Sequence, residues 1–235
     1  MENIINNDRL TWKHRPRGLP ILYEDRDIIV VNKPAGLLTI GTDREKSRTA
    51  HYMLNNYVRK GNPKSRNRVY VVHRLDKDTS GVLIFAKSEQ VKDLLQENWE
   101  NTEKHYMAIV HGRLKEKEGT ISSYLVENKA RRVYSTRDAA KGRLSHTVYK
   151  VTEESKGFSL VNIHLLTGRK HQIRVHFAEK GHPVVGDRKY ENKDIVSERL
   201  ALHARSISFT HPFTHKAMTF DTGIPEDFIR LFRKL

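Results

Sequence analysis

The chain of 235 residues contains no cysteine. It therefore cannot form disulfides, zinc–thiolate sites or iron–sulfur clusters, and it has no thiol nucleophile. Long hydrophobic runs are also missing: the longest clean apolar stretches, such as Val82–Ala86, have the length of a strand and are too short to cross a bilayer. The first eighteen residues lack the apolar segment of a signal peptide. By elimination, we expect a cytoplasmic protein that does not enter membranes.

Acidic residues are few relative to basic ones. The sequence has 43 Lys and Arg against 28 Asp and Glu, which gives a formal net charge of +15. Two stretches, Lys60–Arg68 and Asn128–Arg143, are especially basic. A nucleic acid is the simplest partner for such a charge, and a solvated basic surface without a specific partner is the alternative. The hydrophobic fraction of 37% is ordinary for a globular domain.

Strand signals recur along the chain and outnumber helical ones. Strands are expected at residues 21–23, 28–31, 69–72, 81–86, 104–110, 146–151, 158–165, 201–209 and 217–220. Helices are expected at residues 49–58, 88–99, 169–180 and 226–234, and residues 128–143 are expected to be irregular. Because strands and helices do not alternate regularly, we predict an α+β fold with a mixed, largely antiparallel sheet. Residues 1–18 are expected to form a basic tail ahead of one domain.

One polar loop, His73–Ser80 (HRLDKDTS), lies between two expected strands. A loop held between strands can place a carboxylate rigidly. Arg74 and Lys77 flank Asp76, and nearby positive charge keeps a carboxylate ionised, as a nucleophile or general base requires. On spacing alone, a surface turn in which Asp76 or Asp78 accepts backbone amides is the commoner explanation.

A second segment, residues 165–190, carries an expected basic helix. A Gly-Arg-Lys turn leads into His171, Arg174 and His176. His171 and Arg174 are three residues apart and so share one helix face. An arginine held there can bind a carboxylate or a phosphate with two hydrogen bonds. A solvated basic helix is equally consistent with the pattern.

A tyrosine, Tyr106, lies on the expected strand within EKHYMAIVHG, residues 103–112. A strand tyrosine is most often a core residue whose hydroxyl reaches water. The alternative is an exposed ring that stacks on a nucleic-acid base. The strand alone favours the core interpretation.

Four motifs together resemble the RluA-type pseudouridine synthases and, more distantly, the RsuA type. In chain order they are ILYEDRDIIVVNKPAGLLTI, HRLDKDTSGVLIFAKS, EKHYMAIVHG and LLTGRKHQIRVHFAEKGHPVVGDRKY, and the similarity runs from about Ile21 to Phe228. The resemblance implies the pseudouridine synthase fold, with a central RNA-binding cleft and a catalytic domain over residues 19–235. Many members carry an N-terminal S4 RNA-binding module, for which the tail is too short, so we expect a catalytic domain alone.

The resemblance also implies roles for individual residues. Asp76 matches the catalytic aspartate, and Arg174 matches the arginine that pairs with it. Tyr106 matches the active-site tyrosine, which stacks on the uracil and is a candidate for removing its C5 proton. Further contacts with RNA are expected at Arg74, Lys77, Arg169 and His171.

The implied reaction breaks the N1–C1′ bond of uridine, turns the uracil and rejoins it through C5. It needs no cofactor and no metal, and we expect a monomer acting on ribosomal or transfer RNA. Whether Asp76 attacks C1′ of the ribose or C6 of the base stays open, as do the RNA and the uridine. The target base has to be flipped out of its stack to reach the enzyme.

Two other classes of protein are weighed against this one. A noncatalytic RNA-binding protein would use the same basic surface, but Asp76 is present at the catalytic position. A metal-dependent hydrolase would use His171, His176, His182 and Asp187, but these residues lack the HExxH spacing. An activity insensitive to EDTA would separate the alternatives.

Overall fold

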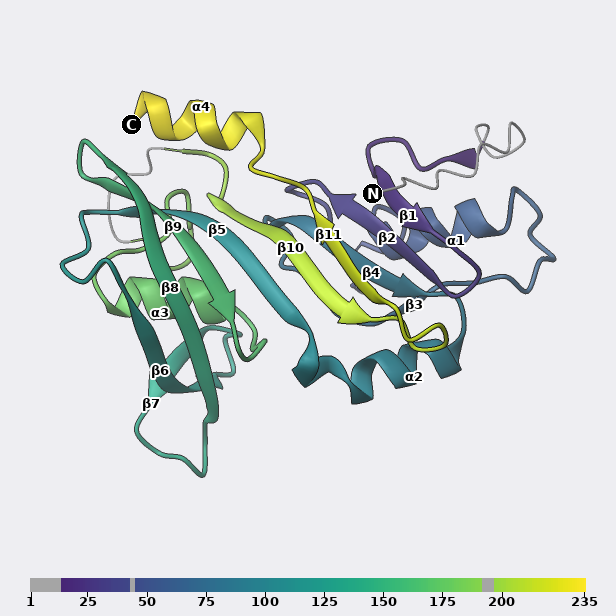
Figure 1. The fold of residues 1–235 in the computed structure, drawn as a ribbon, viewed down its shortest axis with the longest axis horizontal. Helices are drawn as coiled ribbons and strands as arrows, with labels where there is room; N and C mark the ends of the chain where they lie inside the picture. The colour runs from purple at the N-terminus through teal and green to yellow at the C-terminus, as the bar shows by residue number, and fades with distance from the viewer. Residues whose placement is uncertain (1–13, 43–44, 192–196) are drawn as a thin grey trace. The chain divides into compact units, whose positions relative to one another are not determined.

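A computed structural model describes residues 14–42, 45–191 and 197–235 (Figure 1). Residues 1–13 of the expected tail lie outside the described residues. The fold is α+β, as predicted, with eleven strands and four α-helices in the described part of the chain. The chain divides into two compact units: one contains the residues up to Thr102 together with Phe209–Phe220, and the other contains Glu103–Ser208 together with Asp221–Leu235. The prediction of one domain over residues 19–235 stays a prediction.

The first unit is built on three antiparallel strands, β1 (Ile21–Glu24), β2 (Ile28–Lys33) and β4 (Ser80–Ala86). In the β2–β4 ladder, Val31 lies opposite Leu83. All seven residues of β4 and five of the six in β2 are buried. Strands covered on both faces need continuous apolar runs, which explains why the sequence shows no alternation there.

Two helices complete the first unit, and hydroxyl side chains begin both. α1 (Ala50–Val58) starts at Thr49, whose Oγ1 accepts the N–H of Tyr52 at 3.1 Å. α2 (Glu89–Glu97) starts at Ser88, whose Oγ accepts the N–H of Val91 at 3.2 Å. Such caps satisfy N–H groups that have no partner inside the helix. The predicted helices at 49–58 and 88–99 are thus confirmed, the second ending in a short 3₁₀ helix at residues 99–101.

The first unit also contains a short strand and the turn of a hairpin. β3 (Tyr70–Val71) pairs with the end of β4. β10 (Leu202–Thr210) and β11 (Ala217–Asp221) pair with each other, and the turn between them belongs to the first unit.

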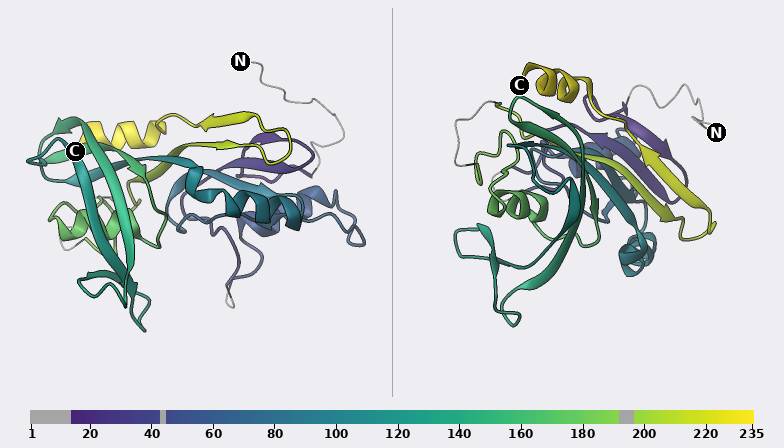
Figure 2. Two further views of the ribbon diagram at one scale, coloured as in Figure 1. Left: turned by 60° about the horizontal axis from the view of Figure 1, so that its bottom comes forward. Right: turned by 60° about the vertical axis from the view of Figure 1, so that its left-hand side comes forward.

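The second unit is an antiparallel sheet in the order β10-β5-β9-β8-β6-β7. Its strands besides β10 are β5 (Glu103–His111), β6 (Glu118–Glu127), β7 (Val133–Thr136), β8 (Arg143–Ser155) and β9 (Phe158–Leu165). Helix α3 (Gln172–Glu179) packs against β6, β7 and β8, as Figure 2 shows, and buries Ile173 and Phe177 in the core. The closing helix α4 (Glu226–Lys234) adds Phe228 and Phe232.

The structure corrects three sequence-based expectations. β6 was not anticipated, because its buried residues, Ile121 and Leu125, are spaced widely in a polar strand. β7 forms within residues 128–143, which were expected to be irregular. α3 begins at Gln172 rather than Arg169, because His171 adopts φ +55°, a left-handed conformation that cannot continue a helix.

Among the described residues, no helix is both long and apolar enough to span a membrane.

Candidate active site

The loop that carries Asp76 leads from β3 to β4 in the first unit. Asp76 is half-buried, and the carbonyl of Asp76 accepts the N–H of Thr79 at 3.2 Å, which closes a turn. The side chains of Arg74 and Lys77 are exposed on either side. The turn predicted for this segment is therefore present, and both predicted RNA-binding residues of the loop reach solvent.

A buried threonine holds the residue before Asp76. The hydroxyl of Thr39 donates to the carbonyl of Leu75 at 3.0 Å and accepts the N–H of the same residue at 3.2 Å. Thr39 is 3% exposed, so water does not compete for these bonds. Both polar groups of the Leu75 backbone are thereby satisfied, although Leu75 belongs to no strand.

A buried lysine holds the residue after Asp76. Lys33, at the end of β2, is fully buried, and its ammonium donates to three carbonyls. These are the carbonyls of Pro34, Leu37 and Lys77, at 3.0, 2.8 and 3.0 Å. Burial lowers the pKa of Lys33 to about 8, and the negative charges of Asp78 and Asp76 oppose that shift. Lys33 thus stabilises the loop by hydrogen bonds and by charge.

A histidine fixes the start of the same loop. His73 Nε2 accepts the N–H of Ile84 in β4 at 3.1 Å. The His73 ring lies 4.6 Å from the ring of Trp99, centroid to centroid. Because Nε2 accepts, the proton of the neutral ring is on Nδ1. The His73 side chain therefore ties the start of the loop to β4, beyond the point at which β3 ends.

Arg174 lies on α3 in the second unit and is bound by a buried carboxylate. Its Nε and Nη2 donate to the two carboxylate oxygens of Asp187 at 2.7 and 2.8 Å. The carboxylate of Asp187 is fully buried and also accepts the N–H groups of Lys189 and Tyr190, at 3.0 and 3.2 Å. Two of the five guanidinium N–H groups are used in this way. The guanidinium is fixed in one orientation by a planar, two-bond contact.

The turn before Asp187 requires a glycine. Gly186 has φ +75°, and a Cβ atom built on it would lie 2.1 Å from the carbonyl oxygen of Arg199. Any larger residue would displace the backbone that carries Asp187, because 2.1 Å is far below a van der Waals contact. The sequence Gly-Asp at 186–187 therefore sets the place of the carboxylate that binds Arg174.

Tyr190 packs against a cluster of four cations, formed by Arg132, Lys170, Arg174 and Lys189. Arg132 and Arg174 lie 5.1 and 5.2 Å from the centre of the Tyr190 ring, at cation–π distance. Burial lowers the pKa of Lys189, and the positive charges of Lys170, Arg174 and Arg132 lower it further. Glu127 forms an ion pair with Lys170. Two carboxylates, those of Glu127 and Asp187, thus face four cations.

His171 takes a place at the edge of this cluster. The hydroxyl of Tyr190 accepts the N–H of Val133 at 3.0 Å and lies 2.8 Å from His171 Nδ1. Burial raises the pKa of Tyr190, so the hydroxyl stays protonated beside His171. The predicted RNA-binding residue Arg169 is exposed at the start of the same segment.

Tyr106 lies in the middle of the second unit's sheet. On β5 it faces Ala204 of β10 and Ile163 of β9, and it is half-buried against the core. The second unit therefore contains Tyr106, Arg174, Arg169 and His171, whereas Asp76, Arg74 and Lys77 belong to the first. The pairing of Arg174 with Asp76 joins the two units and stays a prediction.

The residues of the alternative metal site have other partners. His176 is buried between Ser123 and Thr147, at 3.0 and 2.9 Å, and His182 Nδ1 lies 2.8 Å from the carbonyl of His111. Burial lowers the pKa of His176 to about 4. With Asp187 bound to Arg174, these side chains do not converge on one point.

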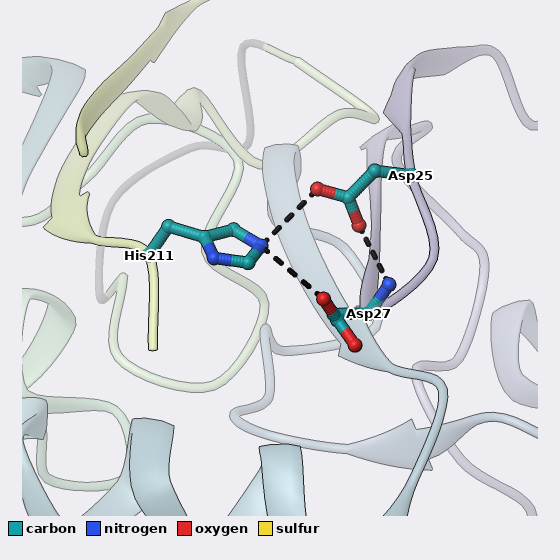
Figure 3. A group of neighbouring side chains, drawn as sticks. All are labelled: Asp25, Asp27 and His211. Atoms are coloured by element: carbon teal, nitrogen blue, oxygen red, sulfur yellow. Dashed lines mark hydrogen bonds and ion pairs between the residues drawn. The ribbon is translucent and has the colours of Figure 1, made fainter. Parts of the chain in front are cut away.

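One other group, Asp25, Asp27 and His211, has the composition of a metal site; it is the only such group in the described ranges (Figure 3). His211 Nε2 lies 3.1 and 4.0 Å from the two carboxylates. His211 Nδ1 accepts the N–H groups of Phe213 and Thr214, at 3.3 and 3.2 Å. Because Nδ1 accepts, Nε2 carries the proton and has no lone pair for a cation. The cluster is a polar link between the β1–β2 and β10–β11 turns.

Sequence reasoning missed three residues that hold the Asp76 loop or Arg174 in place: Lys33, Thr39 and Asp187. The signal for Lys33 was a charged residue at the end of an apolar run. No pattern in the sequence marks Thr39, because its partner is 36 residues away. Asp187 was weighed only as a metal ligand.

Comparison with known proteins supports the family seen in the motifs. The family model described as RNA pseudouridylate synthase matches residues 27–179. The chain is 33% identical to "Ribosomal large subunit pseudouridine synthase D" of Blochmanniella floridana, covering 92% of this chain and 73% of that protein. It is 35% identical to "Dual-specificity RNA pseudouridine synthase RluA" of Vibrio cholerae, covering 89% and 84%.

A solved structure shows the same fold. "Human RNA Pseudouridylate Synthase Domain Containing 4" superposes with a TM-score of 0.76 at 23% identity, covering 92% of each chain. The matched family model includes the Asp76 loop, Tyr106 and Arg174. This chain therefore belongs to the RNA pseudouridylate synthase family, is of the RluA type, and is an isomerase.

Proposed function

We propose that this enzyme converts specific uridines of folded ribosomal or transfer RNA to pseudouridine, with Asp76 as its nucleophile. The observation that carries the proposal is the anchoring of the Asp76 loop from both sides. Thr39 binds the backbone of Leu75, and Lys33 binds the carbonyl of Lys77. A carboxylate whose chain neighbours are both fixed keeps one direction, as attack on a defined atom requires.

The reaction rearranges one nucleotide without changing its composition. The N1–C1′ bond breaks, C1′ bonds to C5, a proton leaves C5, and N1 gains a proton. Asp76 would form a temporary bond to C1′ of the ribose or to C6 of the base, and would leave again as a carboxylate. Both routes need an ionised Asp76, and positive charge nearby favours that form.

Two residues of the second unit complete the proposed chemistry. Arg174 keeps Asp76 ionised and aimed, while Asp187 fixes the plane of its guanidinium. Tyr106 stacks on the flipped uracil, and its hydroxyl takes part in the removal of the C5 proton.

The proposed RNA surface includes the exposed Arg74 and Lys77 and the cationic cluster around Tyr190. Cations that outnumber their carboxylates attract phosphates without reading sequence. The names of the two relatives, one for the ribosomal large subunit and one of dual specificity, support ribosomal or transfer RNA as the target. We accordingly propose that the enzyme works in the cytoplasm, as a monomer.

The test is a map of pseudouridine at single-nucleotide resolution. RNA from a strain that lacks the gene is compared with RNA from the same strain carrying the wild-type gene, Asp76→Asn or Asp78→Asn. We expect wild type and Asp78→Asn to restore the missing sites, and Asp76→Asn to restore none while still binding RNA. Sites restored by Asp76→Asn would exclude Asp76 as the nucleophile.

A further inference from the structure

The segment that follows β2 contacts the Asp76 loop through the side chain of Thr39. Thr39 makes two hydrogen bonds to Leu75, and both lie in a dry interior. We propose that Thr39 is a positioning residue, whose hydroxyl sets the direction of Asp76 by fixing the peptide groups of Leu75. This inference rests on the proposed role of Asp76.

Thr39 is itself held firmly to a helix. Its carbonyl accepts the N–H of His51 at 3.0 Å, and the neighbouring carbonyl of Leu38 accepts the N–H of Ala50 at 2.8 Å. Leu38 also pairs with Thr49, the residue that caps α1. The support for the loop is therefore the N-terminus of a packed helix rather than another loop.

The two bonds act on the two peptide groups that flank Leu75, one of which joins Leu75 to Asp76. The carbonyl of Leu75 belongs to the peptide that joins it to Asp76, so a bond to that oxygen restrains the plane from which the Asp76 side chain leaves. The N–H of Leu75 restrains the plane on the other side. Leu75 is 7% exposed, and its apolar side chain adds a third restraint.

Lys33 restrains the loop on the other side of Asp76, by binding the carbonyl of Lys77, but it has further partners. It binds the carbonyls of Pro34 and Leu37 as well as that of Lys77, so it organises two loops at once. Its loss would remove the ammonium donor of three carbonyls at once. The hydroxyl of Thr39 bonds to the Asp76 loop and, within the described residues, to no second loop. A substitution at Thr39 therefore separates an effect on positioning from an effect on folding better than one at Lys33.

The experiment compares two substitutions at Thr39. Thr39→Val keeps the shape and removes the hydroxyl, whereas Thr39→Ser keeps the hydroxyl. The matched control is Ser88→Ala, which removes a helix cap in the same unit without touching the loop. Each variant is assayed on bulk RNA that carries tritium at C5 of uracil and comes from cells lacking the gene. Tritium is released when C5 loses its hydrogen, after C5 has bonded to C1′.

We expect Thr39→Val to lower the single-turnover rate by about 10²-fold, because a small misplacement of a reacting group has that effect. The RNA concentration at half-saturation should not change, and Thr39→Ser should recover most of the rate. Ser88→Ala should lower the melting temperature and leave the rate intact. If Thr39→Val does not fold, Thr39→Ala takes its place with the same expectation.

Other results would overturn the inference. A Thr39→Val enzyme with the wild-type rate would show that the hydroxyl has no influence on Asp76. Rates that fall in proportion to stability in Thr39→Val and Ser88→Ala alike would give Thr39 a structural role only. Wild-type enzyme that releases no tritium from any RNA would instead contradict the proposed function, so the two failures are distinguishable.

Discussion

The guanidinium of Arg174 binds the carboxylate of Asp187 through two parallel hydrogen bonds, at 2.7 and 2.8 Å, with Asp187 fully buried. Asp187 follows Gly186 on a turn that admits no side chain there. The arginine on which the proposed mechanism depends thus has its direction set by a residue thirteen positions further along the chain. Removing either member leaves the other buried without its partner, so activity and stability have to be measured together.

The first prediction concerns this pair. Arg174→Ala should lower the rate at least about 10²-fold, as expected for one strong electrostatic contact in a closed site. Arg169→Ala and Lys170→Ala remove exposed charges of the same segment and should cost far less. The double variant Arg174→Met with Asp187→Asn should recover stability but not activity, because no unpaired charge is left buried. Tritium release and urea unfolding measure the two properties, and equal losses of rate at all three basic positions would indicate a diffuse RNA contact.

The second prediction concerns salt. RNA affinity should fall steeply between low and moderate salt, because binding to phosphates releases counterions. Arg132→Ala and Lys189→Ala should each reduce the slope of log affinity against log salt by about 1. Lys150→Ala is the control, since Lys150 is paired with Glu118 on an exposed part of β8. Filter binding on bulk ribosomal RNA gives the slopes, and an affinity that does not respond to salt would exclude this surface.

The third prediction concerns acid. Burial first, and then the charge of His146, lower the pKa of His176 to about 4, from 6.5 in the unfolded chain. Between pH 6.5 and pH 4, His176 is therefore protonated in the unfolded state but not in the native state. Stability falls as the pH drops through this range. The loss due to His176 should reach about 3 kcal/mol.

Urea unfolding at pH 7 and pH 4.5 measures most of this loss, which is complete only below pH 4. His176→Gln should shrink the difference between the two pH values, while His203, whose pKa is also about 4, keeps its own share. His215→Asn, at an exposed position, should leave the difference as in wild type. A His176→Gln protein with the full acid sensitivity would show that other groups cause it.

The sequence predicted well where apolar periodicity and local chemistry act together. β9 and α4 have the bounds that the pattern indicated, and the caps at Thr49 and Ser88 begin the helices expected there. It failed at β6, whose two buried residues, Ile121 and Leu125, are separated by three less buried ones. The sheet stabilises this strand more than its composition does.

The candidate site was predictable only in part, for a related reason. Asp76, Tyr106 and Arg174 stand in long motifs whose resemblance to the family implies their roles. Thr39 and Asp187 act by binding a backbone or a side chain that only the folded chain brings near. Propensity and spacing carry no information about such contacts, because they arise from tertiary structure.

The last prediction separates the two roles assigned to Tyr106. Stacking needs the ring, and proton removal needs the hydroxyl. Tyr106→Phe keeps the ring, so it should bind RNA and break the N1–C1′ bond but lose the C5 proton slowly. Tyr106→Leu removes both, and its RNA binding should weaken by roughly 1–3 kcal/mol, which one base–aromatic stack contributes. If the ring is instead a core residue, neither stacking nor proton removal depends on it. Tyr106→Leu would then lower the stability of the protein.

Single-turnover assays on one RNA, with quantification of rearranged but unreleased uracil, distinguish these cases. A Tyr106→Phe enzyme that turns over like wild type would leave only the stacking role. If Tyr106→Leu also behaves like wild type in binding and rate, Tyr106 is a core residue, as its half-buried place between β9 and β10 permits. Accumulation of rearranged uracil in Tyr106→Phe alone would assign the hydroxyl to the final proton transfer, since every earlier bond change would already have occurred.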